Sequence, residues 1–277
     1  MTDIPLLTLN DGQTMPQLGF GLWQVPPDAA TGIVKSALET GYRMLDSAYF
    51  YRNEAAVGDG LRAAGVARED VFITTKVWNG DHGRAAARAS IERSLKTMGI
   101  DALDLILIHW PVPSRDLYVE TWQALIEARQ DGLVRSIGVS NFNAEHLDRI
   151  IGETGVTPVL NQIEVNPELQ QPQMRAANAE RNILTQSWTP LGNGRSFDAA
   201  PITQAAARTG KSPAQVILRW HVQLGLAVIP RSVNPERQAQ NMDVFDFELT
   251  AAEMEAITTL DVGLRTGPDP SVFKLLG

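Results

Sequence analysis

The chain has 277 residues, with 32 acidic and 24 basic side chains and a formal net charge of −8. This acidic balance argues against a protein that binds nucleic acid through a basic face. Cysteine is absent, which excludes disulfides, thiolate nucleophiles and cysteine-based zinc sites. The four histidines have no metal-binding spacing, so we predict no metal site.

The N-terminus and the hydropathy pattern predict a cytoplasmic protein with no membrane partner. The first residues lack the basic region and the apolar core of a secretory signal. No uninterrupted apolar segment approaches the roughly 20 residues that are needed to cross a bilayer.

The chain opens with a predicted β-hairpin over residues 6–16, because Asp11 and Gly12 form a typical hairpin turn between two short apolar segments. Eight further apolar segments follow. They are predicted to be buried parallel strands, because they are apolar throughout instead of alternating. They cover residues 19–21, 44–46, 71–75, 103–109, 137–139, 160–163, 184–188 and 227–229.

The segments between these strands have the apolar spacing of helices. Val119, Trp122 and Leu125, for example, follow the period of about 3.6 residues that is typical of a helix. Ser212 with Gln215 three residues later predicts an N-terminal capping box, and residues 250–253 predict another.

Eight strand–helix units without a low-complexity linker predict an α/β fold, a single (β/α)8 TIM barrel that forms one domain over residues 1–277. A doubly wound open sheet is the alternative, because periodicity cannot detect closure of the sheet. We expect the hairpin to close the bottom of the barrel and residues 264–277 to form an irregular tail.

Four polar side chains stand at neighbouring strand ends of the predicted barrel. Asp46, Lys76 and His109 end the second, third and fourth strands, and Tyr51 follows in the next loop. Taken singly, each has an ordinary structural explanation, such as helix capping or packing at a rim. Active sites of barrels lie where these strand ends meet. The shared position of these four side chains therefore favours an acid–base site, because a buried lysine needs a partner.

We expect the ammonium group of Lys76, paired with Asp46, to lower the pKa of Tyr51 from its ordinary value of about 10. A tyrosine tuned in this way suits proton donation to an oxygen that gains negative charge. His109 can orient a carbonyl oxygen toward it. Protonation of a carbonyl is half of a reduction, so the site also needs a source of hydride.

Two late loops are candidates for binding a phosphate-containing cofactor. The G-x-G-x-x-G fingerprint is absent, because Gln24 stands where its third glycine should be. Barrels often hold phosphates after strands seven and eight. Residues 190–194 contain two glycines there, and Arg231, Ser232 and Arg237 follow in the next loop. An exposed basic helix start would explain the second loop equally well.

Several segments resemble the aldo-keto reductase family, in the family's order and over nearly the whole chain. Residues 41–54 are similar to its N-terminal signature, and residues 75–76 and 108–111 to its catalytic lysine and histidine segments. Residues 138–142, 161–162 and 229–232 match further family segments. Within the family, the sequence most resembles bacterial 2,5-diketo-D-gluconate reductases.

The resemblance implies NADPH-dependent reduction of small aldehydes, ketones, dicarbonyls or keto-sugars, with NADH less favoured. It implies that Tyr51 is the general acid, that Lys76 and Asp46 tune it and that His109 orients the carbonyl. It also implies that substrate contacts come from Trp23, Tyr49, Trp78, His109 and Trp110.

The cofactor contacts that the resemblance implies run from the nicotinamide to the adenine. Ser140, Asn141 and Gln162 would hold the carboxamide, and Trp188 would stack on the ring. Leu191 and Gly192 would approach the pyrophosphate. The complete implied set is Gly21, Leu22, Asp46, Ser140, Asn141, Gln162, Trp188, Leu191, Gly192, Arg231, Ser232, Val233, Arg237, Gln240 and Asn241.

Three positions depart from the family pattern. Arg231 replaces the common lysine but keeps the charge for a 2′-phosphate. Gln240 replaces a common acidic residue near the adenine. Tyr49 stands where a small residue is usual, and it narrows the pocket if it points into the mouth.

Two other kinds of protein are compatible with parts of this pattern. A cofactor-sensing module would bind NADPH without turnover, and a barrel hydrolase would need a metal cluster or paired carboxylates at the mouth. We expect a monomer, because no apolar stripe demands a partner.

Overall fold

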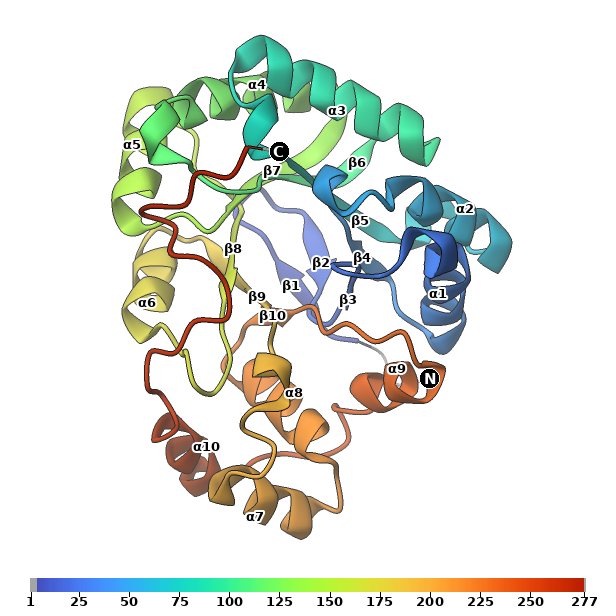
Figure 1. The fold of residues 1–277 in the computed structure, drawn as a ribbon, viewed down its shortest axis with the longest axis vertical. Helices are drawn as coiled ribbons and strands as arrows, with labels where there is room; N and C mark the ends of the chain where they lie inside the picture. Colours follow the sequence, from blue (N-terminus) through green and yellow to red (C-terminus); the bar gives the residue numbers. More distant parts are fainter. Residues whose placement is uncertain (1–3, 277) are drawn as a thin grey trace.

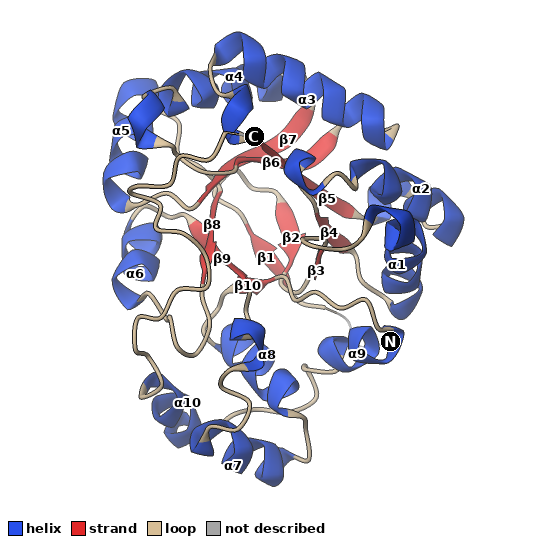
Figure 2. Cartoon of the chain, viewed as in Figure 1, coloured by secondary structure: helices blue, strands red, loops and turns tan. Residues whose placement is uncertain are grey.

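The computed structural model describes residues 4–276, in which eight parallel strands form an inner ring surrounded by helices (Figures 1 and 2). Their order in the sheet is the order of the chain. The strands are β3 (Phe20–Gly21), β4 (Met44–Asp46), β5 (Phe72–Val77), β6 (Leu103–Ile108), β7 (Val134–Ser140), β8 (Leu160–Glu164), β9 (Leu184–Trp188) and β10 (Ala227–Val228). The eight predicted strands are confirmed.

Backbone hydrogen bonds between the first and last strands close the sheet into a barrel. Leu18, just before β3, pairs in parallel with Val228 of β10. The Gly19 amide donates to the Val228 carbonyl at 2.9 Å, and the Val228 amide donates to the Gln17 carbonyl at 2.8 Å. The predicted barrel is therefore confirmed, and the open sheet that periodicity allowed is excluded.

The helices lie outside the strands, as Figure 2 shows. They are α1 (Pro27–Thr40), α2 (Glu54–Ala64), α3 (Arg84–Met98), α4 (Tyr118–Gln130), α5 (Ala144–Thr154), α6 (Pro172–Glu180), α7 (Ala200–Thr209), α8 (Pro213–Gln223), α9 (Pro235–Met242) and α10 (Ala251–Thr258). Both predicted capping boxes are present, Ser212 with Gln215 at α8 and Thr250 with Glu253 at α10. No helix among the described residues is both long and apolar enough to cross a membrane.

The N-terminal hairpin closes the bottom of the barrel, as predicted. Its strands β1 (Leu6–Thr8) and β2 (Thr14–Pro16) pair antiparallel. Leu9 and Met15 are buried in the same apolar cluster as Leu105 and Leu107 of β6. The Asn10 amide group donates to two carbonyls just before β8 and β9, which places the hairpin at the amino ends of the strands.

The chain ends in an irregular segment that lies at the end of the barrel opposite the hairpin. In Figure 1 this segment, residues 264–276, runs in red from α10 past α6 and over the barrel strands. We call it the C-terminal tail. The Trp78 indole after β5 donates to the Leu276 carbonyl at 3.0 Å, so the tail reaches the carboxyl ends of the strands.

Candidate active site

The side chains of the site point inward because residues alternate along each strand. In β4, Leu45 packs outward against the helices, so Met44 and Asp46 point into the barrel. In β5, Ile73 and Val77 pack outward, which turns Lys76 inward. The same alternation turns inward His109 after β6, as well as Ser140, Gln162, Glu164 and Trp188 at the ends of β7, β8 and β9.

A cleft of about 730 Å³ opens at these carboxyl ends. Its lining includes Asp46, Tyr51, His109, Trp188 and Arg231 and thus joins the predicted acid–base group to the predicted phosphate loop. Further predicted residues that line it are Gly21, Trp23, Trp78, Trp110, Ser140, Asn141, Gln162, Leu191 and Arg237.

Asp46, Lys76 and Tyr51 are joined by hydrogen bonds at the cleft floor. The Lys76 ammonium donates to Asp46 Oδ1 at 2.5 Å, to the Ser47 carbonyl at 2.8 Å and to the Tyr51 hydroxyl at 3.4 Å. Lys76 is only 1% exposed and lies behind the residues that line the cleft. The structure therefore brings these three predicted residues together, with the tyrosine facing the open space.

The prediction that Lys76 lowers the pKa of Tyr51 is wrong in this structure. Burial raises the pKa of Tyr51 well above 10.0, and the negative charge of Asp46 raises it further. Lys76 is closer to Asp46 than to Tyr51, so its charge is largely balanced before it can act on the phenol. Burial also lowers the pKa of Lys76, which Asp46 opposes. Tyr51 is therefore protonated at neutral pH and can donate its proton.

His109 faces Tyr51 across the floor, with 5.7 Å between the two ring centroids. Burial lowers the pKa of His109 well below 6.5, and the charge of Lys76 acts in the same direction. The imidazole is therefore neutral at neutral pH and carries one N–H. A neutral donor beside a protonated phenol suits an oxygen acceptor such as a carbonyl.

A connected polar group lies on the side of β7, β8 and β9. The Trp188 indole donates to Asn141 Oδ1 at 2.9 Å, and Asn141 Nδ2 donates to Ser140 Oγ at 3.0 Å. Gln162 Nε2 donates to Asp46 Oδ2 at 2.7 Å and to Gln186 Oε1 at 2.6 Å. Both amide protons of Gln162 are thus engaged, which leaves its Oε1 to accept a hydrogen bond from a ligand.

The basic end of the cleft is formed by Arg231 and Arg237, which are both exposed. Neither makes an ion pair within residues 4–276, although Arg231 donates to the Gln24 carbonyl at 3.0 Å. Other residues predicted for cofactor binding do not line the cleft: Leu22, Gly192, Ser232, Val233, Gln240 and Asn241.

Aromatic side chains form another part of the wall, with one difference from the prediction. Tyr49 does not line the cleft, because its ring stacks under the Arg93 guanidinium of α3, 3.9 Å from the centroid. Its neighbour Phe50 lines the cleft instead and stacks on Trp78 with centroids 3.8 Å apart. Residues 49–51 form a short 3-10 helix, in which neighbouring side chains point about a third of a turn apart.

The conformation of the C-terminal tail and its contacts with the pocket could not be derived from the sequence. Thr266, Gly267, Pro268, Phe273 and Leu275 all line the cleft, and the Phe273 ring packs on Trp110 at 4.4 Å. The aromatic Phe273 was the one available signal. An irregular segment has no periodicity from which its docking site could be derived. Pro190, Asn193 and Gly194 of the candidate loop 190–194 also line the cleft, as does Pro230 beside Arg231. The other lining residues that were missed are Gln24, Thr189, Phe197 and Ile229.

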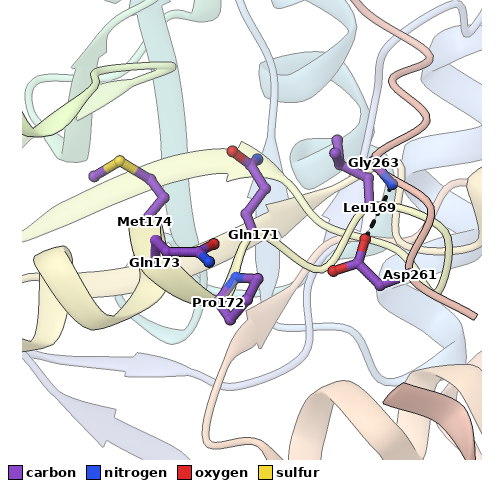
Figure 3. Close-up of a pocket in the computed structure, with 7 residues that line it drawn as sticks. All are labelled: Leu169, Gln171, Pro172, Gln173, Met174, Asp261 and Gly263. Carbon is purple, nitrogen blue, oxygen red and sulfur yellow. Dashed lines mark hydrogen bonds between the residues drawn. The ribbon is translucent and has the colours of Figure 1, made fainter. Parts of the chain in front are cut away.

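A second hollow of about 290 Å³ lies on the outside of the barrel, at the start of α6. Figure 3 shows Pro172, Gln173 and Met174 on one side of it and Asp261 with Gly263 on the other. The Asp261 carboxylate accepts a hydrogen bond from the Gly263 amide at 3.2 Å. This hollow contains none of the predicted site residues.

Comparisons with known proteins agree on one family. The model of the aldo/keto reductase family matches residues 17–262. Methylglyoxal reductase DkgA of Escherichia coli is 50% identical over 275 residues, and an aldo-keto reductase of Mycolicibacterium smegmatis is 49% identical over 273, each match covering 99% of both chains. The crystal structure of Gox0644 is 46% identical with a TM-score of 0.95, covering 99% of this chain and 100% of that one. A mutant of Gox0644, solved in complex with NADPH, has the same identity, coverage and TM-score.

Proposed function

The chain belongs to the aldo/keto reductase family, and from this premise we propose that it uses NADPH to reduce small aldehydes, ketones, dicarbonyls or keto-sugars to alcohols. The observation that carries the proposal is the group of Tyr51, Lys76 and His109 on the floor of a cleft that leads to two exposed arginines. The similarity to methylglyoxal reductases favours a small dicarbonyl as substrate.

The cleft fits the proposed cofactor. Its basic end has two guanidinium groups free of ion pairs among residues 4–276, which suits a phosphate on an otherwise acidic protein. Its inner end has Gln162 Oε1 as an acceptor for a carboxamide and the half-buried indole of Trp188 as an apolar surface. Arg231 and Arg237 would hold the adenosine 2′-phosphate, and Ser140, Asn141, Gln162 and Trp188 the nicotinamide end. NADPH supplies the hydride when it is bound.

The protein's own part in the reaction is proton transfer and orientation. Tyr51 donates its phenolic proton to the carbonyl oxygen as negative charge develops there. His109, which is neutral, donates an N–H to the same oxygen and so fixes its direction. As Tyr51 loses its proton, the Lys76 ammonium, 3.4 Å from the phenol oxygen, stabilises the resulting phenolate. Asp46 holds Lys76 in place.

The test is to follow NADPH oxidation by absorbance with methylglyoxal, other dicarbonyls, aldehydes and keto-sugars, with NADH in parallel. The proposal predicts substrate-dependent loss of NADPH, and slower turnover with NADH. An Arg231→Ala variant is expected to weaken NADPH binding roughly tenfold or more but to change NADH binding little, because only NADPH has the 2′-phosphate. Tight NADPH binding without turnover of any carbonyl would contradict the proposal and favour a cofactor-sensing module.

A further inference from the structure

One buried carboxylate holds the C-terminal tail at the cleft, and it belongs to a residue with no part in the chemistry described above. Glu164 ends β8, points inward and is 1% exposed. Its Oε1 accepts hydrogen bonds from the Thr266 amide at 2.7 Å and the Thr266 hydroxyl at 2.6 Å. Its Oε2 accepts one from the Gly267 amide at 3.0 Å.

We propose that Glu164 is a positioning residue that fixes the tail against Trp188 and thereby sets the wall of the substrate pocket. The proposal rests on the proposed function, since it concerns the pocket in which the carbonyl compound binds. Glu164 itself does not line the cleft, and it acts through Thr266 and Gly267, which do.

The contact between the tail and Trp188 leaves no room for displacement toward the ring. A Cβ atom on Gly267 would lie 2.5 Å from Cη2 of Trp188, closer than such atoms approach. Glu164 and Trp188 are register partners across β8 and β9, so the carboxylate and the indole start from the same level of the sheet. On its other side the indole donates to Asn141. Trp188 is therefore held between the tail and Asn141.

The charge of Glu164 makes this attachment strong. A buried carboxylate is costly unless donors surround it, and hydrogen bonds to a charged acceptor are stronger than neutral ones. The tail supplies three donors. Without them Glu164 would keep one described partner, Asn166 Nδ2 at 3.4 Å. Release of the tail would thus leave an uncompensated charge inside the barrel, and this disfavours release.

Beyond this attachment the tail continues along the cleft. Phe273 packs on Trp110, and the Leu275 carbonyl accepts a hydrogen bond from Asn79 Nδ2 at 2.7 Å. Both Phe273 and Leu275 line the cleft. Trp188 and Trp110 meet edge to face, with ring centroids 6.5 Å apart. A tail freed at Glu164 would move Gly267 away from Trp188 and Phe273 away from Trp110, and so would widen the cleft that these residues line, where a small substrate needs close walls to be oriented.

The first test measures the attachment itself, by amide hydrogen exchange of the tail in the full-length protein. In Glu164→Gln, an amide group of nearly the same shape replaces one acceptor oxygen with a donor. We expect the peptide that contains Thr266 and Gly267 to exchange roughly tenfold faster or more than in the wild type. The matched control is Glu69→Gln, at an exposed position, which should leave the tail unchanged. Unchanged protection in Glu164→Gln would overturn the proposal, whether or not the protein reduces carbonyls.

The second test measures the consequence for substrate binding. For methylglyoxal, Glu164→Gln should raise KM roughly tenfold and lower kcat by a smaller factor. Gly267→Ala keeps the carboxylate but pushes the tail from Trp188, so it should raise KM in the same way. Gly32→Ala is its control, because a Cβ there meets no atom within 4 Å. The double variant should be no worse than the poorer single one, since both act through the tail.

The two tests separate the possible failures. If Glu164→Gln does not fold, Thr266→Val removes one of the three donors with little change of shape, and a smaller rise of KM is expected. Faster tail exchange with an unchanged KM would overturn the role in the pocket. A wild-type protein without reductase activity would refute the proposed function, while the exchange measurement would still decide on the attachment.

Discussion

Tyr51 and His109 owe their protonation states to burial more than to their charged neighbours. Burial keeps the phenol protonated and the imidazole neutral, so the floor of the cleft presents two uncharged donors. The ammonium of Lys76 is paired with Asp46 and lies 3.4 Å from the phenol oxygen, close enough to stabilise a phenolate there. Tyr51 can therefore donate its proton, and His109 a hydrogen bond, to a substrate oxygen from their uncharged forms.

The pH profile of the enzyme tests the neutrality of His109. Burial holds its pKa well below 6.5, so the imidazole does not change charge as the pH rises from about 6.5 to 8. We expect kcat/KM for carbonyl reduction to show no ionisation in this range that His109→Gln removes. A step near pH 6.5 in the wild type that disappears in the variant would show that the histidine titrates and acts as an acid.

Among the elements, the hairpin β1–β2 covers the amino end of the barrel, and side chains of the barrel interior pack against it. Met15 is completely buried beneath the strands, whereas Leu6 in the same hairpin is 62% exposed. Met15→Ala should lower the free energy of unfolding by about 2–5 kcal/mol, because it leaves a cavity. Leu6→Ala should change it by less than about 0.5 kcal/mol. Urea denaturation of both variants measures the difference, and equal effects would show that the hairpin is not part of the core.

The strands were predictable from the sequence because a strand buried on both faces is apolar throughout. The ends of β4, β5 and β6 then placed Asp46, Lys76 and His109 at one mouth. The number of strand–helix units favoured a closed barrel, but periodicity alone could not exclude an open sheet, because closure depends on pairing between Leu18 and Val228, which leaves no periodic signal. The irregular C-terminal tail has no periodic signal either, so its residues were absent from the predicted site.

Side-chain direction in short irregular segments was also beyond sequence reasoning. Tyr49 and Phe50 are both aromatic, and which of them enters the cleft depends on a 3-10 turn and on the position of Arg93 in α3. The pKa of Tyr51 was mispredicted for a related reason. The sequence showed the charges of Lys76 and Asp46, but it did not show the depth of burial or which of the two lies closer to which partner.

At the scale of the whole molecule, buried histidines make the stability depend on pH. Burial lowers the pKa of His82 to about 4 and that of His221 to about 3, each from 6.5. The unfolded chain therefore binds protons below about pH 6.5 that the folded protein does not bind. This contribution to stability is complete above pH 6.5 and is lost as the pH falls toward the folded pKa values. Glu54, whose pKa burial raises, acts in the opposite direction.

A His82→Gln variant isolates one of these contributions. Between about pH 4.5 and 6, the slope of the unfolding free energy against pH should be smaller than in the wild type by up to about 1.4 kcal/mol per pH unit. Denaturation curves at several pH values measure both slopes. Parallel slopes in the two proteins would mean that His82 is not held neutral by the fold.

We propose that this chain reduces carbonyl compounds with Tyr51 as the proton donor. The most direct measurement compares Tyr51→Phe with the wild type, using the rate of NADPH oxidation with methylglyoxal and the affinity for NADPH from tryptophan fluorescence. We predict that kcat falls roughly a hundredfold to ten-thousandfold while NADPH still binds, because only the proton donor is removed. Turnover by Tyr51→Phe at the wild-type rate would show that Tyr51 is not the proton donor, since the proton would then come from another group.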